Sequence, residues 1–452
     1  MQRRAALLLA LAACGPPERP GIAPRHVVLV TIEGLRADRT SAWMHHRPTT
    51  SIPASAADLA AGRAFGFDDL AADGVLFEQA FTPSGDPMAA LHALFSGDRG
   101  LDGERATPDL AHLLGEAGLE THAWVHATGS LPTGLLESFD HAEAFESDLD
   151  VVRAILPFYK RRDWGDGGRA FLWIHLAGPT FPFVPGTAVP DFHEMESGGS
   201  VRTVDCAALY TDGPGPDGLD GSSEARAAVD FDEAVDPIAL QHVAALYDGE
   251  VHELALHLWT LIGFFAFETK SEAPLDDAVV AVCGTGGVEL ERPGTPWGAQ
   301  GLPFDSSLRV PLFLRHRDSL TGRRVLAEPV DLADVAPTLL EWMEATPSSD
   351  ERDGRSLLAL TDSYRERPFE RRPAVAELPA TDGRRGARTA RSADWRLVRF
   401  DDGEELLFDR LRDPDELRPV VLGSPRTEEA LAELREALER ATSSAPEPEG
   451  GP

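Results

Sequence analysis

Three short stretches of the chain, at 26–32, 171–176 and 278–283, are apolar at nearly every position. A strand with water on one face alternates apolar and polar residues, whereas a strand covered on both faces is apolar along its length. These stretches therefore predict an α/β fold whose central, mostly parallel sheet is flanked by helices. Since ligands of such sheets bind beyond the carboxyl ends of the strands, we expect any functional site to follow these three stretches.

Between the predicted strands, apolar residues recur at helical spacing. The clearest such stretch spans about 237–267. Spacings of three and four residues place its apolar side chains on one face of a helix, so they are predicted to be core. These side chains are Leu240, Val243, Tyr247, Val251, Leu254, Leu258 and Phe265.

The main domain is predicted to span 26–360 and to close after a helix at about 331–343. An acidic, loop-rich insertion at 184–235 contains the sequence GPGPDGLDGSS and shows little periodicity, so it is expected to be a surface excursion. Its one cluster of metal-binding residue types is Asp191, His193 and Glu194. Nothing else in the insertion indicates chemistry.

A small C-terminal α+β subdomain is predicted at 373–440. Two strand-like pieces, at 395–400 and 405–409, precede a charged helix at 427–440 that has leucines on one face. The polar tail at 441–452 is expected to be disordered.

The N-terminus has the composition of a secretory signal. Residues 1–13 combine a short cationic start with an apolar run, and Cys14 follows the sequence Leu-Ala-Ala, which resembles a bacterial lipoprotein signal. This pattern predicts a signal peptide at 1–13, a lipid anchor on Cys14 and a Pro/Gly-rich tether at 14–25. The expected location is the bacterial cell envelope, membrane-anchored on the periplasmic side or the surface. The alternative is an ordinary signal peptide with a coincidental cysteine.

The charge of the chain excludes one class of partner. The formal net charge is −33, from 75 acidic and 42 basic side chains. Nucleic acids are bound through clustered Lys and Arg, so no nucleic-acid partner is expected. Beyond Cys14 the chain has only Cys206 and Cys283, without a CxxC pair, so a cysteine zinc site is not expected. Cys283 is predicted to be a buried small hydrophobe.

Several segments, taken in order, resemble the sulfatase family of the alkaline-phosphatase-like superfamily. Each segment is weak alone, but together they extend from about residue 26 to 440. The resemblance implies the sulfatase form of the α/β sandwich, with the small C-terminal subdomain. The segments are VLVTIEGLRADR (28–39), DDLAADGVLFEQAFTPSGDPMAALHALFSG (68–97), YDGEV (247–251), LRVPLFLR (308–315), VDLADVAPTLLE (330–341), DGRSLL (353–358), WRLVRF (395–400) and GEELLFDRLRDPDE (403–416).

The same resemblance assigns the family's metal positions to residues that are poor metal ligands. The first metal aspartate falls on Glu33, and its acidic neighbour falls on Gly34. The Asp-His or Asp-Asn pair after the third strand falls on Thr285 and Gly286. Only the carboxylate of Glu33 survives, so no cofactor is expected, and a divalent cation such as calcium is expected only if the protein is active.

The family's catalytic positions are also altered. The nucleophile, normally a cysteine converted to formylglycine, falls on Pro87, and the arginine after it falls on Leu91. The histidine after the second strand falls on Thr180, and the late His or Lys falls on Ala299. The implied protein is a catalytically inactive pseudosulfatase.

Two non-catalytic roles are predicted for such a protein. The altered pocket, lined by Gly34, Leu91, Thr180, Gly286 and Ala299, would bind a neutral or weakly polar glycan or lipid fragment. Alternatively, the domain would dock on an active relative as a protein partner. A structural lipoprotein without a ligand is a third interpretation.

The rival hypothesis is an active sulfuric or phosphoric ester hydrolase with rearranged metal ligands. Thr82 or Ser84 would then be the nucleophile. The ligands would come from His45, His46, Asp86 or His92.

Overall fold

The computed structural model describes most of the chain. The predicted signal peptide, Cys14, Ala299, almost all of the insertion and the last nine residues lie outside the described residues. No helix in the described part of the chain is long and apolar enough to cross a membrane. The described residues are 24–52, 66–100, 108–127, 131–162, 168–181, 183, 185, 237–266, 278–290, 292, 298, 300–316, 320, 322–325, 327–347, 352–361, 368–381 and 384–443.

The main domain contains an eight-stranded sheet in the order β5-β4-β6-β1-β7-β8-β2-β9. All neighbouring strands are parallel except β8, which runs antiparallel to both β7 and β2. The predicted fold class is therefore confirmed. The strands are β1 (His26–Ile32), β2 (Val75–Phe77), β4 (Glu120–His126), β5 (His141–Phe145), β6 (Ala170–Leu176), β7 (Ala278–Gly284), β8 (Leu312–Arg315) and β9 (Arg323–Val325), with a separate pair, β3 (Ala80–Phe81) and β10 (Val330–Asp331).

The three apolar stretches are the three central strands. In β1 the odd-numbered apolar residues Val27 and Leu29 join one core cluster, and Val28, Val30 and Ile32 join the other. A strand buried on both faces must be apolar on both, which is why these strands are recognisable in the sequence. The prediction was exact for β1 and one residue short at one end of β6 and of β7.

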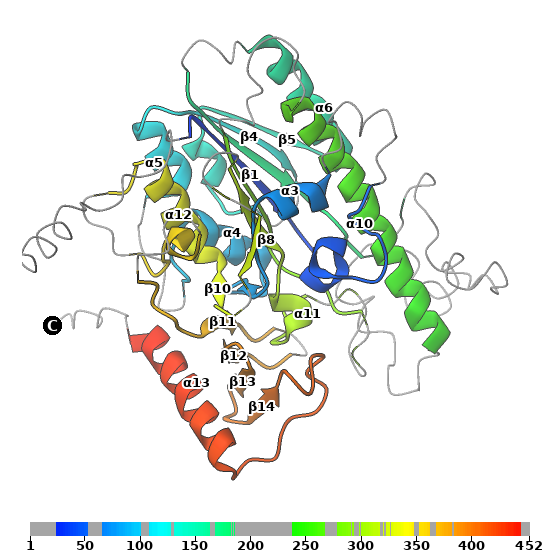
Figure 1. Cartoon of the computed structure of the whole chain (residues 1–452), viewed down its shortest axis with the longest axis vertical. Coiled ribbons are helices and arrows are strands. Elements are labelled where there is room, and N and C mark those ends of the chain that lie inside the picture. Colours follow the sequence, from blue (N-terminus) through cyan, green and yellow to red (C-terminus); the bar gives the residue numbers. More distant parts are fainter. Residues whose placement is uncertain are drawn as a thin grey trace, which may run out of the picture.

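Helices cover both faces of the sheet (Figure 1). One layer contains α4 (Pro87–Ser96), α5 (Leu110–Glu116) and α12 (Val335–Trp342), and the other contains α3 (Phe67–Asp73), α6 (Asp148–Arg161) and α10 (Pro237–Ala266). Helix α10 corresponds to the long amphipathic stretch in the sequence. Shorter helical turns are η1 (Ala37–Arg39), η2 (Ser41–Trp43), η3 (Leu135–Ser138), η5 (Leu332–Asp334), η6 (Leu357–Leu360) and α11 (Asp305–Leu308).

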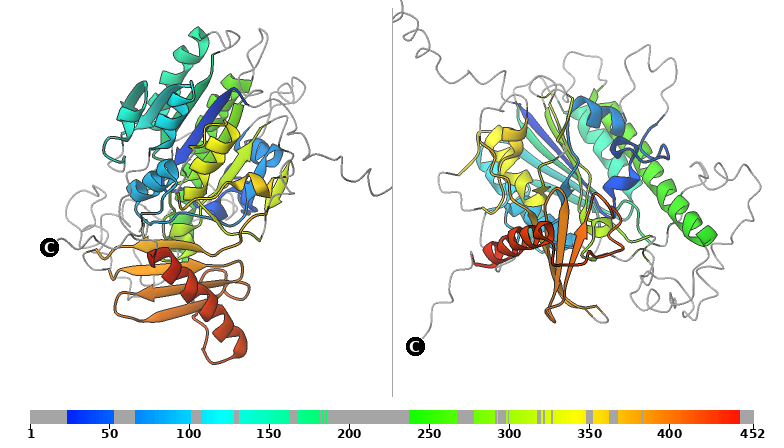
Figure 2. Two further views of the ribbon diagram at one scale, coloured as in Figure 1. Left: turned by 90° about the vertical axis from the view of Figure 1, so that its left-hand side faces the viewer. Right: turned by 60° about the horizontal axis from the view of Figure 1, so that its bottom comes forward.

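The C-terminal part forms a four-stranded antiparallel sheet covered on one face by a helix (Figure 2). Strands β13 (Trp395–Phe400) and β14 (Glu405–Asp409) match the two strand-like pieces of the sequence. Strands β11 (Ala374–Leu378) and β12 (Ala387–Arg391) were not predicted. Helix α13 (Pro425–Ser443) packs its leucines against this sheet.

Candidate functional site

A network of hydrogen-bonded, buried polar side chains ends at Glu33, directly after β1. The indole nitrogen of Trp173 donates to Oγ1 of Thr31 at 2.9 Å, and this oxygen lies 2.8 Å from Nδ1 of His175. Nε2 of His175 lies 3.1 Å from Oε1 of Glu33. One tautomer satisfies the whole network, with Thr31 donating to Nδ1 and Nε2–H donating to Glu33. The Glu33 side chain is 6% exposed and the His175 side chain is fully buried, so this carboxylate is held within the protein.

The backbone after β6 packs tightly against the backbone after β1. Gly34 has φ +65°, and a Cβ atom there would lie well inside 3.0 Å of the carbonyl oxygen of Pro179. Gly178 has φ +61°, and a Cβ atom there would overlap the carbonyl oxygen of Glu33 in the same way. Both positions favour glycine on conformational grounds as well. The present backbone therefore excludes an aspartate at either position.

After β7 the backbone is less crowded. The amide of Thr285 donates to the carbonyl oxygen of Ile32 at 2.9 Å, which joins the ends of β7 and β1. Thr285 is fully buried. A Cβ atom at Gly286 would have its nearest neighbour, the carbonyl oxygen of Ser307, at 3.8 Å. A side chain at Gly286 is therefore sterically permitted, although this chain has none.

Helix α4 begins at Pro87, the position that the resemblance assigns to the nucleophile. Asp86 caps this helix by accepting a hydrogen bond from the amide of Met88 at 2.9 Å. Proline is favourable at a first helical position, so Pro87 has a structural role there. Leu91 lies one turn further on and is fully buried in the core cluster. Leu91 thus cannot line an open pocket, contrary to the sequence-based prediction, because its side chain packs under the sheet.

A second histidine–carboxylate pair lies at the same edge of the sheet. His126 ends β4, and its Nδ1 lies 2.7 Å from Oδ1 of Asp148 in the first turn of α6. Asp148 also accepts hydrogen bonds from the amides of Ala177 and Gly178. The hydrogen bond that the His126 ring donates to Asp148 raises the pKa of His126, which burial alone would lower. Asp148 therefore fixes both this imidazole and the backbone turn after β6.

The hydroxyl groups of the rival hypothesis have structural partners. Thr82 is fully buried and donates to the carbonyl oxygen of Ser84 at 2.8 Å. Ser84 accepts from the amide of Asp86. His45 lies 3.1 Å from Asp248 of α10. Among the described residues, His45, His46, Asp86 and His92 are not part of any group of three that could hold a metal ion.

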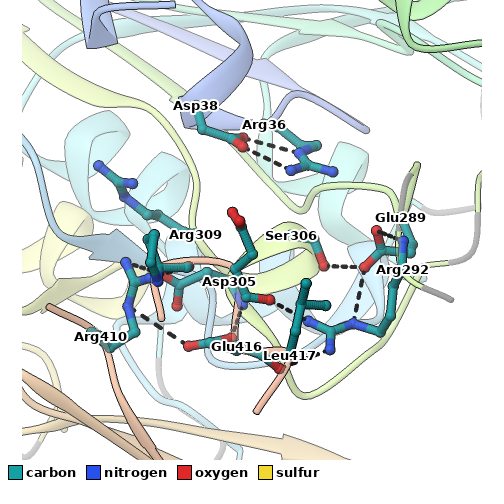
Figure 3. Close-up of a pocket in the computed structure, with 12 residues that line it drawn as sticks. Arg36, Asp38, Glu289, Arg292, Asp305, Ser306, Arg309, Arg410, Glu416 and Leu417 are labelled. Atoms are coloured by element: carbon teal, nitrogen blue, oxygen red, sulfur yellow. Dashed lines mark hydrogen bonds and ion pairs between the residues drawn. The ribbon is translucent and has the colours of Figure 1, made fainter. Parts of the chain in front are cut away.

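A cavity of about 200 Å³ lies beside this edge, between the main domain and the C-terminal subdomain (Figure 3). We call it the interdomain pocket. Its wall contains four arginines and five acidic residues. The lining residues are Arg36, Asp38, Glu289, Arg292, Asp305, Ser306, Arg309, Arg410, Pro414, Asp415, Glu416 and Leu417.

The charges of the interdomain pocket largely neutralise one another. Arg36 binds Asp38 through two hydrogen bonds, at 2.9 and 2.7 Å, and Ser306 donates to Glu289 at 2.6 Å. Arg410 lies 2.6 Å from Asp305. Burial alone would raise the pKa of Asp305, but the arginines around it hold this pKa well below its usual range. The pocket is polar and nearly balanced in charge, which suits a ligand that both donates and accepts hydrogen bonds.

Comparison with known proteins defines the class of this fold. Residues 297–444 match the family model "N-sulphoglucosamine sulphohydrolase, C-terminal", which covers about a third of the chain. The sequence matches no curated protein.

Solved structures extend the similarity over nearly the whole chain. The phosphonate monoester hydrolase of Agrobacterium radiobacter is 18% identical, with a TM-score of 0.66, and the match covers 93% of this chain and 95% of that one. The corresponding enzyme of Silicibacter pomeroyi is 19% identical, with a TM-score of 0.61 and coverage of 92% and 94%. A protein solved with its substrate D-glucosamine-2-N,6-O-disulfate is 15% identical, with a TM-score of 0.64 and coverage of 96% and 100%.

The fold is therefore that of the sulfatases and phosphonate monoester hydrolases, the alkaline-phosphatase-like fold. More particularly, the C-terminal subdomain resembles that of the sulphohydrolases. Identities below 20% establish the fold and do not transfer an activity.

Sequence reasoning missed the partners of Glu33 and the pair of His126 and Asp148. His175 lies inside an apolar stretch that was interpreted only as a strand. A histidine at the second-last position of a buried strand was the available signal, because a buried imidazole requires a hydrogen-bond partner. Nothing in the sequence pairs residues 126 and 148.

Proposed function

We propose that this protein is a sulfatase-like envelope lipoprotein that does not hydrolyse sulfate or phosphate esters and instead binds a ligand or a partner protein. The main observation in support of this proposal is the contact between Glu33 and His175. The backbone of Gly178 and Pro179 also packs over Gly34. Calcium takes six to eight oxygen ligands in proteins. At the family's metal positions this chain offers one carboxylate, already engaged, so these residues do not fit such an ion.

The absence of a nucleophile at position 87 supports the same proposal. Sulfatases attack the ester with a covalent nucleophile, and proline has no nucleophilic atom. The nearest hydroxyl groups along the chain, those of Thr82 and Ser84, lie in buried or turn positions where they hold the backbone. The hydrogen bonds of both hydroxyl groups in the described part of the chain are to backbone groups, so neither is paired with a general base.

The experiment combines elemental analysis with hydrolysis assays on sulfate and phosphate esters in added calcium, magnesium, manganese or zinc. We expect no turnover above the rate without protein. Metal-dependent turnover that disappears in a Glu33→Ala variant would restore the rival hypothesis of a hydrolase with rearranged ligands. If the protein binds metal without turnover, and the Glu33→Ala variant binds it equally, the metal belongs to another site. That outcome leaves the proposal intact.

For the ligand-binding role, the interdomain pocket replaces the pocket expected from the sequence. Carboxylates and guanidinium groups alternate on its wall, and they match the donor and acceptor capacity of sugar hydroxyl groups. The nearly balanced charge of the wall and the acidic chain as a whole disfavour a polyanion. We therefore propose a neutral or weakly charged saccharide as the ligand.

Leu417 offers a test that leaves the ion-pair network untouched. It lines the interdomain pocket and is 49% exposed, so Leu417→Arg should block the pocket without a folding cost. Leu422→Arg is the matched control, because Leu422 is 45% exposed and is not among the lining residues. Calorimetry with a panel of neutral and sulfated oligosaccharides should show binding that Leu417→Arg removes and Leu422→Arg retains. No saccharide binding would favour docking on an active relative or a purely structural role, and an intact sulfatase encoded next to this chain would favour docking.

The envelope location rests on Cys14 and the segments around it. We propose that cleavage before Cys14 and lipidation of its thiol anchor the domain to a membrane through the 14–25 tether. Metabolic labelling with a fatty acid should mark the wild-type protein and not Cys14→Ser. An unlabelled protein that is still secreted would indicate an ordinary signal peptide.

A further inference from the structure

We propose that Glu120, His122 and His141 form a binding site for a transition-metal ion such as Zn²⁺. The site lies at the amino end of β4, the end of the strand opposite His126 and the candidate functional site. It is independent of the proposed function, because it shares no residue with the edge that follows β1, β6 and β7. Within the described part of the chain, these three residues are the one group with metal-ligand geometry.

The sheet itself brings the two histidines together. Strands β4 and β5 are parallel neighbours, and His122 pairs with His141 in their register. Residues paired in this way project to the same face. Glu120 lies two residues before His122 on β4, so it also projects to that face. His141 is 65% exposed on the edge strand β5, so an ion can reach the group from solvent there.

The distances suit a single ion. Nε2 of His122 lies 2.9 Å, and Nε2 of His141 lies 3.8 Å, from Oε1 of Glu120. The three ligand atoms all lie within 4.8 Å of one another. Ligands at 2.0–2.1 Å from a tetrahedral ion are separated by about 3.3 Å, so small side-chain rotations would close the site.

His122 is the fixed ligand of the group. Its side chain is 5% exposed and its ring is stacked on Trp124, with centroids 5.4 Å apart and planes inclined by 5°. Phe158 of α6 packs against it at 4.5 Å. The buried Nε2 makes no hydrogen bond of acceptable geometry, although it faces Glu120. A buried polar atom without a well-aligned hydrogen bond is costly, and a metal ion bound by both this Nε2 and Oε1 of Glu120 would satisfy it.

The carboxylate of Glu120 is oriented by Arg162. Arg162 donates at 2.5 Å to Oε2, which leaves Oε1 facing the two imidazoles. Metal-binding carboxylates are commonly oriented by a partner of this kind.

The residue types select the ion. Two imidazoles and one carboxylate, with a fourth position open to water, form a typical zinc donor set. Calcium and magnesium prefer oxygen ligands alone and fit this group poorly. A bound ion would also link the edge strand β5 to β4.

The test is a titration of tag-free, chelator-treated protein with Zn²⁺ in competition with a chromophoric chelator. We expect one ion per chain, and affinity at least about tenfold weaker in His141→Ala and in Glu120→Gln. His141 is 65% exposed, so its replacement should not disturb folding. Zn²⁺ should also raise the thermal unfolding midpoint of the wild type and not that of His141→Ala.

The matched control is His112→Ala on α5. His112 is 55% exposed and lies 3.5 Å from Glu116, which makes an exposed His–Glu pair without a third ligand. Its replacement should leave zinc affinity unchanged, as should Glu33→Ala. No stoichiometric binding by the wild type, or equal affinities for His141→Ala and His112→Ala, would overturn the proposal.

Discussion

Nε2 of His175 lies 3.1 Å from Oε1 of Glu33, and the pair is buried where the strands β6 and β1 end. The position that the resemblance to sulfatases assigns to a metal carboxylate is thus an internal hydrogen-bond acceptor here. The contact gives Glu33 a structural role, which stability measurements can test independently of any assay of catalysis.

Replacing Glu33 should reduce stability. Glu33→Ala leaves the buried Nε2–H of His175 without an acceptor, which costs about 1–3 kcal/mol in the free energy of unfolding. Glu33→Gln retains an acceptor of similar size and should cost less. Urea denaturation measures both. The control is Glu116→Ala, on a side chain that is 66% exposed and should change stability by less than about 0.5 kcal/mol. A Glu33→Ala protein as stable as the wild type would contradict this role.

Adding a methyl group at Gly34 should be strongly destabilising. Gly34→Ala combines a left-handed backbone conformation with overlap of the Pro179 carbonyl, and the two effects together cost about 2–4 kcal/mol. Gly286→Ala is the matched control after β7, where the added atom meets nothing closer than 3.8 Å. Equal stability of the two variants in chemical denaturation would show that the backbone after β6 does not pack as described.

The pair of His126 and Asp148 should make stability depend on pH. The pKa of His126 is raised in the folded protein, chiefly by the hydrogen bond that its ring donates to Asp148. The stabilisation is therefore fully present below the unfolded pKa, about 6.5, and is lost as pH rises through the higher folded value. The difference in unfolding midpoint between wild type and His126→Gln should shrink over that window. A difference that does not vary with pH would count against the pair.

Asp305 should stabilise the contact between the two domains. It begins α11 and pairs with Arg396 of β13 and with Arg410, which follows β14. Asp305→Ala leaves these two buried guanidinium groups with Glu416 as their one remaining carboxylate partner among the described residues, so we expect a loss of about 3 kcal/mol. Thermal and urea unfolding measure the effect. Asp402→Ala, which removes an exposed partner of Arg385, is the control and should leave the unfolding midpoint unchanged.

The sequence alone determined the layered architecture. Strands β1, β6 and β7 are apolar on both faces, and this pattern arises only when helices cover both sides of a sheet. Helix α10 was predicted to within a residue at its end because its apolar spacing extends over eight turns. Strands β11 and β12 were missed, since each has only five residues and a strand so short carries little periodic signal.

The sequence also located the edge of the sheet where a site would lie, and it named Glu33, Gly34 and Pro87 there. Only the tertiary structure showed that His175 holds Glu33 and that the Pro179 carbonyl occupies the space above Gly34. Only register pairing brought His141 beside His122. Such contacts join residues far apart in the chain, and their geometry depends on how strands and helices pack. Local periodicity carries no information about that packing.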